Sequence, residues 1–103
     1  MPMSGFKQRL QSGEVLGGYV NAIPSAVSVQ AMAAAGADWI VLDQEHAPIG
    51  LESLQAMIAA TAGTNCAPMV RVSKADEAWV KPALDSGAEG ICFPHVSTAE
   101  EAA

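Results

Sequence analysis

The chain has 103 residues, of which half are hydrophobic and 16% are charged, and its formal net charge is −6. This composition is typical of one small globular domain and not of a disordered segment. Lys and Arg number only five, which argues against a nucleic-acid partner because nucleic-acid-binding surfaces need clustered basic side chains. The first residues, MPMSGFKQRLQSGE, lack the apolar core of a signal peptide, and no later run is long enough to span a membrane. We therefore expect a cytoplasmic protein with no membrane partner.

Four short runs of apolar or β-branched residues recur along the chain, at spacings of roughly 25 residues. They are EVLGGYVNA (14–22), DWIVLD (38–43), APMVRV (67–72) and EGICFP (89–94). Each spacing has room for one strand followed by one helix, so the runs predict four strands.

Helical patterns fill the gaps between these strands. Pro24 and Ser25 can cap a helix through AVSVQAMAAA that ends at Gly36. The segment LESLQAMIAATAG predicts a second helix, which ends at Gly63. The apolar face of this second helix comprises Leu51, Leu54, Met57, Ile58 and Thr61.

Asp76 can cap a third helix that ends at Gly87. Its apolar face comprises Trp79, Val80, Ala83 and Leu84. Pro82 should kink this helix or shift its start, because proline has no N–H to donate inside a helix. The final STAEEAA predicts the first turn of a fourth helix, capped by Ser97 or Thr98.

Strands that alternate with helices imply a parallel sheet with right-handed crossovers. Two architectures fit this pattern: a small open, doubly wound sheet, or the first half of an eight-stranded (β/α)8 barrel. The pattern alone does not separate them. GGYVNAIPS, after the first strand, contains neither GxGxxG nor GxxxxGK[ST], which weakens the nucleotide-binding version of the open sheet. Cys66 and Cys92 have no ligand-spaced partner, so we expect two buried thiols and neither a zinc site nor a disulfide.

Polar side chains follow the predicted strands at the points where they end. Asp43 ends the second strand, His46 lies in the following loop, and Arg71 lies near the end of the third strand. The ends of parallel strands meet on one face, where loops converge on a ligand. Asp43 is close enough to accept the imidazole N–H of His46, and Arg71 can neutralise a carboxylate or an enolate. These residues predict an acid–base site, although each alone is also typical of a loop cap, a salt bridge or a structural histidine.

Neighbouring residues carry weaker signals. Glu45 is interpreted as a residue that shapes the loop, with a direct role in the site as the alternative. The signal from Gln44 is weaker still. His95 follows Pro94 at the end of the fourth strand, and we expect it to be a solvated loop histidine. Tyr19, in the first strand, fits core packing and the aromatic wall of a site equally well.

Five segments together resemble the HpcH/HpaI aldolase family, the class II pyruvate aldolases that include 4-hydroxy-2-oxo-heptane-1,7-dioate aldolase. They are FKQRLQSGE, LGGY, AGADWIVLDQEHAPIGLESL, PMVRVSKAD and ALDSGAEGICFPHVSTAEEA. The resemblance implies a (β/α)8 TIM barrel, of which residues 1–103 would be the amino-terminal portion, with about four parallel strands and their helices. It also implies an enzyme that reversibly cleaves 4-hydroxy-2-oxo acids to pyruvate and an aldehyde. Such enzymes use a divalent metal, magnesium or manganese, with cobalt as a further candidate, and form homo-oligomers.

The resemblance also implies roles for individual residues. His46 matches the family's catalytic base and Arg71 its transition-state stabiliser. Asp85, in ALDSG, matches the aspartate that raises the basicity of the histidine. Asp43 and Glu45 match the acidic residues of the DxEH segment as supporting residues. Tyr19 stands where many members have a tryptophan that lines the pocket.

Two features of this chain do not fit a complete member of that family. Asp85 would lie at the end of a helix, at the opposite end of the barrel from His46. Either the chain bends back there, with the help of Pro82, or Asp85 serves the site of an adjacent subunit, and we favour the second. The family's metal ligands come from later strands, so we expect no metal ligand in this chain. Two alternatives to a partial aldolase sequence stay open: a non-catalytic half-barrel that pairs with another chain, and a citrate-lyase-β-like lyase that acts on a carboxylated thioester.

Overall fold

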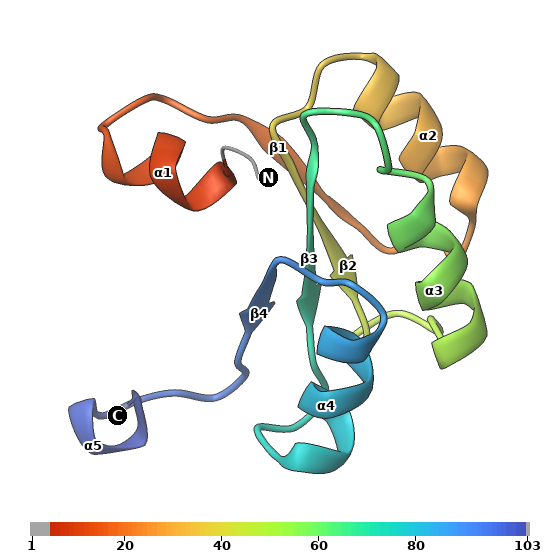
Figure 1. The fold of residues 1–103 in the computed structure, drawn as a ribbon. Helices are drawn as coiled ribbons and strands as arrows, with labels where there is room; N and C mark the ends of the chain where they lie inside the picture. Colours follow the sequence, from red (N-terminus) through yellow and green to blue (C-terminus); the bar gives the residue numbers. More distant parts are fainter. Residues whose placement is uncertain (1–4, 103) are drawn as a thin grey trace.

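The sheet has four parallel strands whose spatial order, β1-β2-β3-β4, is their order in the chain. The computed structural model describes residues 5–102. The strands are β1 Gly18–Asn21, β2 Trp39–Asp43, β3 Ala67–Arg71 and β4 Gly90–Cys92. The helices that follow them are α2 Ala26–Ala34, α3 Leu51–Ala59 and α4 Glu77–Asp85, and α2, α3 and α4 lie along one side of the strands (Figure 1). A doubly wound sheet reverses its strand order and carries helices on both faces, so this arrangement favours an arc of a barrel.

The core lies between the sheet and this helical layer. Ile40 and Leu42 of β2 are fully buried and point toward the helices, while Val41 and Asp43 alternate onto the other face and are also buried. Burial on both faces explains why the strand is apolar until its last residue, as the sequence predicts. The helices contribute buried side chains to the same cluster: Val29, Ala33, Leu54, Met57, Ile58 and Ala83.

Two helices differ from their predicted apolar faces. Leu51 is 47% exposed and Leu84 is 50% exposed, so both assignments to the buried faces are wrong. Leu51 is the first residue of α3, and the buried face of this helix comprises Leu54, Met57 and Ile58. The same helix ends at Ala59, earlier than the predicted stop, and Gly63 adopts a φ of 78° in the turns that follow.

Helix α4 begins where its cap predicts. The Asp76 carboxylate accepts a hydrogen bond from the backbone N–H of Trp79 (3.3 Å), which satisfies one of the free donors of the first turn. Pro82 lies inside the helix and does not shift its start. The proline has no N–H to donate within the helix, and the next residue, Ala83, is fully buried in the core.

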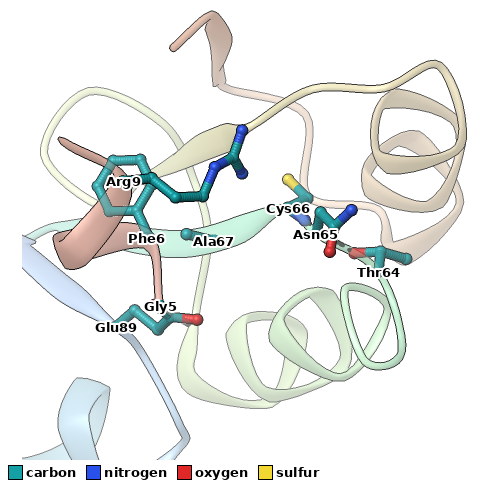
Figure 2. Close-up of a pocket in the computed structure, with 8 residues that line it drawn as sticks. All are labelled: Gly5, Phe6, Arg9, Thr64, Asn65, Cys66, Ala67 and Glu89. Carbon is teal, nitrogen blue, oxygen red and sulfur yellow. Dashed lines mark hydrogen bonds between the residues drawn. The ribbon is translucent and has the colours of Figure 1, made fainter. Parts of the chain in front are cut away.

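Both ends of the described chain carry a short helix outside the main layer (Figure 1). Helix α1, Phe6–Gln11, was not predicted. Its Arg9 donates hydrogen bonds to Glu14 (2.7 Å) and Asp38 (2.8 Å), and this pairing ties the helix to the start of β2. Figure 2 shows Phe6 and Arg9 beside Cys66 and Ala67 at the start of β3. Cys66 is buried as expected, whereas Cys92 is only partly buried.

The final helix, α5, spans Ala99–Ala102 as the sequence predicts. The Thr98 hydroxyl accepts from the backbone N–H of Glu101 (3.1 Å), and the Glu101 carboxylate accepts from the N–H of Ser97 (3.1 Å). Thr98 is therefore the cap. Between residues 5 and 102, no helix is long and apolar enough to cross a membrane.

The packing of α3 predicts unequal effects of two leucine substitutions on the same helix. Leu54→Ala should lower the free energy of unfolding by about 2–5 kcal/mol, because it leaves a cavity at a fully buried position. Leu51→Ala is the matched control and should change stability by about 0.5 kcal/mol or less. Urea denaturation of both variants measures the difference, and equal losses would contradict this assignment of the helix faces.

Candidate active site

The carboxyl ends of β2 and β3 bring an acid and a guanidinium together. Asp43 and Arg71 are register partners in the parallel ladder, so their side chains leave the sheet on the same face. That face is opposite to the helical layer and corresponds to the interior of a barrel. The side chain of Asp43 is 4% exposed and that of Arg71 is 33% exposed. The buried carboxylate therefore has the guanidinium as its charge partner.

Both carboxylate oxygens of Asp43 accept hydrogen bonds. Oδ2 accepts from Arg71 Nη2 (2.7 Å) and Oδ1 accepts from Arg71 Nε (3.2 Å), which gives a bidentate pair. Oδ1 also accepts from the backbone N–H groups of Glu45 (2.9 Å) and His46 (3.1 Å). The carboxylate thus fixes both the guanidinium and the first turn of the loop that carries the predicted base.

The Arg71 guanidinium lowers the pKa of Asp43 to about 2, and the two backbone N–H donors act in the same direction. Burial alone would raise that pKa, so the hydrogen bonds outweigh the cost of desolvation. In return, the Asp43 carboxylate raises the pKa of Arg71. Both groups are therefore charged throughout the range in which enzymes work.

The loop after β2 is held at both of its ends. The backbone N–H of Gln44 donates to the carbonyl of Arg71 (2.9 Å), which extends the ladder by one residue. The side-chain amide of Gln44 donates to the carbonyl of Ile49 (3.1 Å), and Ile49 is buried in the core. Gln44 therefore has a structural role, and Glu45 and His46 lie on a fixed loop at the mouth of the sheet.

Glu45 faces three basic side chains. Its Oε1 lies 3.5 Å from His46 Nε2 and 3.6 Å from Arg71 Nε, and its Oε2 lies 3.3 Å from His95 Nε2. These three contacts are ion-pair distances and not hydrogen bonds. The side chain of Glu45 is only 12% exposed, whereas those of His46 and His95 are 68% and 85% exposed.

The predicted contact between Asp43 and the imidazole of His46 is wrong. Asp43 accepts the backbone N–H of His46 instead, and the imidazole faces Glu45. The tight turn that places His46 three residues after Asp43 directs the main chain, not the ring, at the carboxylate. The carboxylate beside the imidazole of His46 is therefore that of Glu45 and not that of Asp43.

His95 is a solvated loop histidine, as expected, with its side chain 85% exposed, and it also lies beside Glu45. It follows β4 with a φ of 56°, a left-handed backbone conformation that residues other than glycine adopt less often. The signal in the sequence was its place: it follows a strand end that the fold brings to the same face as Asp43 and Arg71.

Tyr19 and Asp85 lie away from this cluster. Tyr19 pairs with Ile40 in the ladder, so its side chain leaves the sheet on the helical side, and it is 51% exposed. Asp85 is the last residue of α4 and is exposed, at the end of the helix that leads back to the start of the next strand. Among the described residues, no hydrogen bond or ion pair connects either side chain to Asp43 or Arg71. Their predicted roles stay predictions.

A separate pocket lies at the amino ends of the strands, between α1 and the start of β3 (Figure 2). The basic side chain that lines it, Arg9, is paired with Glu14 and Asp38. The Arg9 guanidinium lowers the pKa of both carboxyl groups. Among the described residues that line this pocket, the one basic side chain is already paired, so Arg9 has a structural role there. The catalytic end of a parallel barrel is the opposite one.

No group of three or more His, Cys, Asp or Glu residues within 5–102 is arranged to hold a metal ion. The cluster at the carboxyl end brings together a guanidinium and two imidazoles around the carboxylate of Glu45. Arg71 supplies a fixed positive charge there.

Strand order, helical layer and polar end together define an arc of a parallel (β/α) barrel with a polar cluster at the carboxyl ends of the strands. The chain belongs to the HpcH/HpaI aldolase/citrate lyase family, whose sequence profile matches residues 19–103. The expected resemblance and the expected fold class, the first half of a TIM barrel, are both confirmed.

Individual relatives agree with this assignment. The chain is 38% identical over 101 residues to a hydroxypyruvate/pyruvate aldolase of Roseovarius nubinhibens, covering 98% of this chain and 39% of the relative. It is 40% identical over 103 residues to a 4-hydroxy-2-oxovalerate aldolase of Rhodococcus jostii, covering 99% and 40%. The crystal structure of the citrate synthase SbnG matches with a TM-score of 0.86 at 36% identity, over 93% of this chain and 39% of that one. The chain thus spans about two fifths of the length of these relatives.

The Asp43–Arg71 pair predicts a specific acid sensitivity. Because the folded protein lowers the pKa of Asp43 from its ordinary value of 3.8 to about 2, the pair stabilises the fold by about 2 kcal/mol above pH 4. This contribution is lost as the pH falls from about 4 to about 2, where the carboxylate takes up a proton. Asp43→Asn should lower stability at pH 7 by at least this amount and lose less stability than the wild type on acidification.

Urea denaturation at pH 7, 4 and 2.5 measures this difference. Asp76→Asn is the matched control, since asparagine caps a helix as well as aspartate and Asp76 is exposed. A wild type whose stability falls no further than that of Asp43→Asn between pH 4 and 2.5 would contradict the role of the pair.

Proposed function

We propose that this chain supplies the acid–base part of the active site of a metal-dependent aldolase, which reversibly cleaves 4-hydroxy-2-oxo acids to pyruvate and an aldehyde. The observation that carries the proposal is the Asp43–Arg71 pair, which holds a guanidinium beside the loop of His46. The names of the relatives support the reaction class, since two of them are aldolases of hydroxypyruvate/pyruvate and of 4-hydroxy-2-oxovalerate.

In this mechanism His46 takes the proton from the 4-hydroxyl of the substrate. The C3–C4 bond then breaks, the aldehyde forms at C4, and the electron pair of the broken bond passes to the enolate of pyruvate. Arg71 stabilises the negative charge of that enolate, because Asp43 holds its guanidinium in place before the reaction begins. A proton returned to C3 of the enolate completes pyruvate.

The divalent metal of such an aldolase, magnesium, manganese or cobalt, finds no fitting ligand set among the residues described. We infer that its ligands belong to the part of the barrel that this chain does not contain. No step assigned to His46 or Arg71 passes through the metal.

We infer that residues 1–103 are the amino-terminal portion of a single barrel domain. Four strands leave two open parallel edges, and closure requires further strands. The chain's coverage of two fifths of its relatives supports this inference. The alternative is a half-barrel that pairs with another chain and has no catalytic role. Coding DNA that continues in frame beyond residue 103 would favour the first, and a stop codon there the second.

Asp85 is proposed to act in the site of an adjacent subunit of a cytoplasmic homo-oligomer. Its exposed position at the end of α4, away from Asp43 and Arg71, supports a role between subunits over one within its own. Mixed oligomers of Asp85→Asn and His46→Ala subunits test this, because each mixed interface would contain one intact pair. Recovered activity is expected, and inactive mixtures would count against sharing between subunits.

A second candidate is a lyase that acts on a carboxylated thioester. The family description itself includes citrate lyase, and a citrate synthase is among the similar structures. Arg71 could hold the carboxylate or enolate of either substrate class. Assays with 4-hydroxy-2-oxo acids and with carboxylated thioesters, each with magnesium or manganese, would separate the two activities.

Substitutions at the two central residues should affect turnover strongly. In the protein that carries the whole barrel, His46→Ala should lower kcat for pyruvate release by about 10²–10⁴-fold, since it removes the base. Arg71→Lys should lower kcat by about 10²–10³-fold, because lysine cannot reproduce the bidentate pair with Asp43. Lys7→Ala, an exposed charge on α1, is the control and should keep full activity.

Pyruvate release is followed with a coupled lactate dehydrogenase assay in the presence of magnesium or manganese. A wild-type protein that binds metal but releases no pyruvate from any 4-hydroxy-2-oxo acid would contradict the aldolase proposal.

A further inference from the structure

The first two strands end in the same hydrogen-bonding arrangement. Asn21 is the last residue of β1, and Asp43 is the last residue of β2. In each case the side-chain Oδ1 accepts from the backbone N–H two residues later, from Ile23 at 2.9 Å and from Glu45 at 2.9 Å. An Asx turn of this kind fixes the path of the chain as it leaves a strand. The loop after β2 carries Glu45 and His46, whereas the loop after β1 has no role in the proposed reaction.

Asn21 also joins its loop to helix α2. Its side chain points to the helical side of the sheet, because Asn21 is the register partner of Leu42, and it is 1% exposed. Nδ2 of Asn21 donates to Oγ of Ser28 (2.9 Å), which donates in turn to the carbonyl of Ser25 (2.7 Å). The end of β1, the loop and the first turn of α2 are therefore one hydrogen-bonded unit with Asn21 at its centre.

This unit presents the side chain of Ile23. The backbone N–H of Ile23 donates to Asn21, and its carbonyl accepts from the N–H of Ser25 (2.8 Å). Pro24, the next residue, has a restricted φ and no N–H. The backbone polar groups of Ile23 are thus occupied within the loop, while its side chain is 55% exposed at the carboxyl end of the sheet.

Val20 adds a second apolar side chain at this strand end. It pairs with Val41 in the ladder, so it lies on the interior face with Asp43 and Arg71, and it is 56% exposed. No charged residue occurs between positions 15 and 37, which include β1, its loop and α2. The charged side chains described at the carboxyl end of the sheet come from β2, β3 and the loops that follow β2 and β4, and β1 supplies an apolar side.

A small-molecule site combines polar groups that orient the ligand with apolar groups that bury its carbon chain. We propose that Ile23 and Val20 form an apolar wall against the carbon chain beyond C4, the part of the substrate that leaves as the aldehyde. Asn21 is the positioning residue that holds Ile23 in this wall. The substrate class is then a 4-hydroxy-2-oxo acid whose aldehyde fragment ends in an uncharged alkyl chain, because a terminal carboxylate finds no charged partner on this side. The proposal rests on the proposed aldolase function, but its first test does not require cleavage.

The first test measures binding. 2-Oxo acids that lack the 4-hydroxyl keep the carbon skeleton of the substrates and cannot be cleaved. Isothermal titration calorimetry of the protein that carries the whole barrel, with magnesium or manganese, compares 2-oxopentanoate, 2-oxoheptanoate and 2-oxoheptanedioate. The wild type should bind 2-oxoheptanoate about three- to tenfold more tightly than either of the others, because each further buried methylene favours binding and a buried carboxylate without a partner opposes it.

Ile23→Ala should remove this preference. Binding of 2-oxoheptanoate should weaken about three- to tenfold, while binding of 2-oxopentanoate should change less than twofold. Ile23→Lys should reverse the order of the two longer acids, because it places a cation near the terminal carboxylate. Val15→Ala is the matched control, since Val15 is 95% exposed and precedes β1 at the other end of the strand, and all three affinities should stay unchanged.

A wild type that binds none of these acids, or binds 2-oxopentanoate and 2-oxoheptanoate equally, would overturn the proposal. A preference that survives unchanged in Ile23→Ala would overturn it as well.

Asn21 is tested through the same preference. Asn21→Ala removes Oδ1 and should reduce the preference for the longer acid to less than twofold, whereas Asn21→Asp keeps this acceptor and should retain the preference. Ser28→Ala, a milder change, releases the other end of the Asn21 side chain and should reduce the preference in the same direction. Equal weakening of both acids in these variants, with the preference intact, would indicate a merely structural role and contradict the positioning role.

The second test uses cleavage of the corresponding 4-hydroxy-2-oxo acids, followed by pyruvate release. The values of kcat/KM should show the same order in the wild type and the same loss of preference in Ile23→Ala. If the wild type releases no pyruvate but binding depends on Ile23 as expected, the aldolase function fails and the apolar wall stands. If pyruvate is released with equal kcat/KM from all three acids, the apolar wall fails and the aldolase function stands.

Discussion

The pair between Asp43 and Arg71 is the interaction on which the site depends. It joins the last residues of two neighbouring strands and satisfies a buried carboxylate with a bidentate guanidinium. The same carboxylate accepts two backbone N–H groups of the following loop. One side chain therefore sets the place of the cation and the path of the chain that carries His46. Its pKa of about 2 reflects how strongly the fold favours the ionised form.

An arginine–carboxylate pair lies at each end of the sheet, and the two pairs have different roles. At the amino end, Arg9 binds Asp38 and Glu14 and ties α1 to β2, so its charge is consumed within the fold. At the carboxyl end, Arg71 is paired with Asp43 but stays one-third exposed, next to Glu45 and two accessible histidines. The first arrangement stabilises the barrel arc, and the second leaves a positive charge and two exposed imidazoles where loops converge.

The sequence was sufficient to predict the strands, because burial on both faces of β2 and β3 demands continuous apolar runs. It was also sufficient to predict the start of α4, because Asp76 caps this helix by a local contact. The choice between an open sheet and a barrel did not follow from that pattern, since the two differ in strand order. Helix α1 was missed because it is held by the long-range contact of Arg9 with Asp38. The candidate site was only partly predictable. Asp43 and Arg71 were found from strand ends, but the direction of the His46 ring and the approach of His95 to Glu45 depend on loop geometry.

We propose that Arg71, held by Asp43, stabilises the enolate of pyruvate. Exchange of the methyl hydrogens of pyruvate for deuterium in D₂O, followed by proton NMR with magnesium or manganese present, tests it without any aldehyde partner. We predict that the complete barrel catalyses this exchange and that Arg71→Lys reduces it by about 10²-fold or more. Exchange at the wild-type rate in Arg71→Lys, or none in the wild type, would contradict the claim.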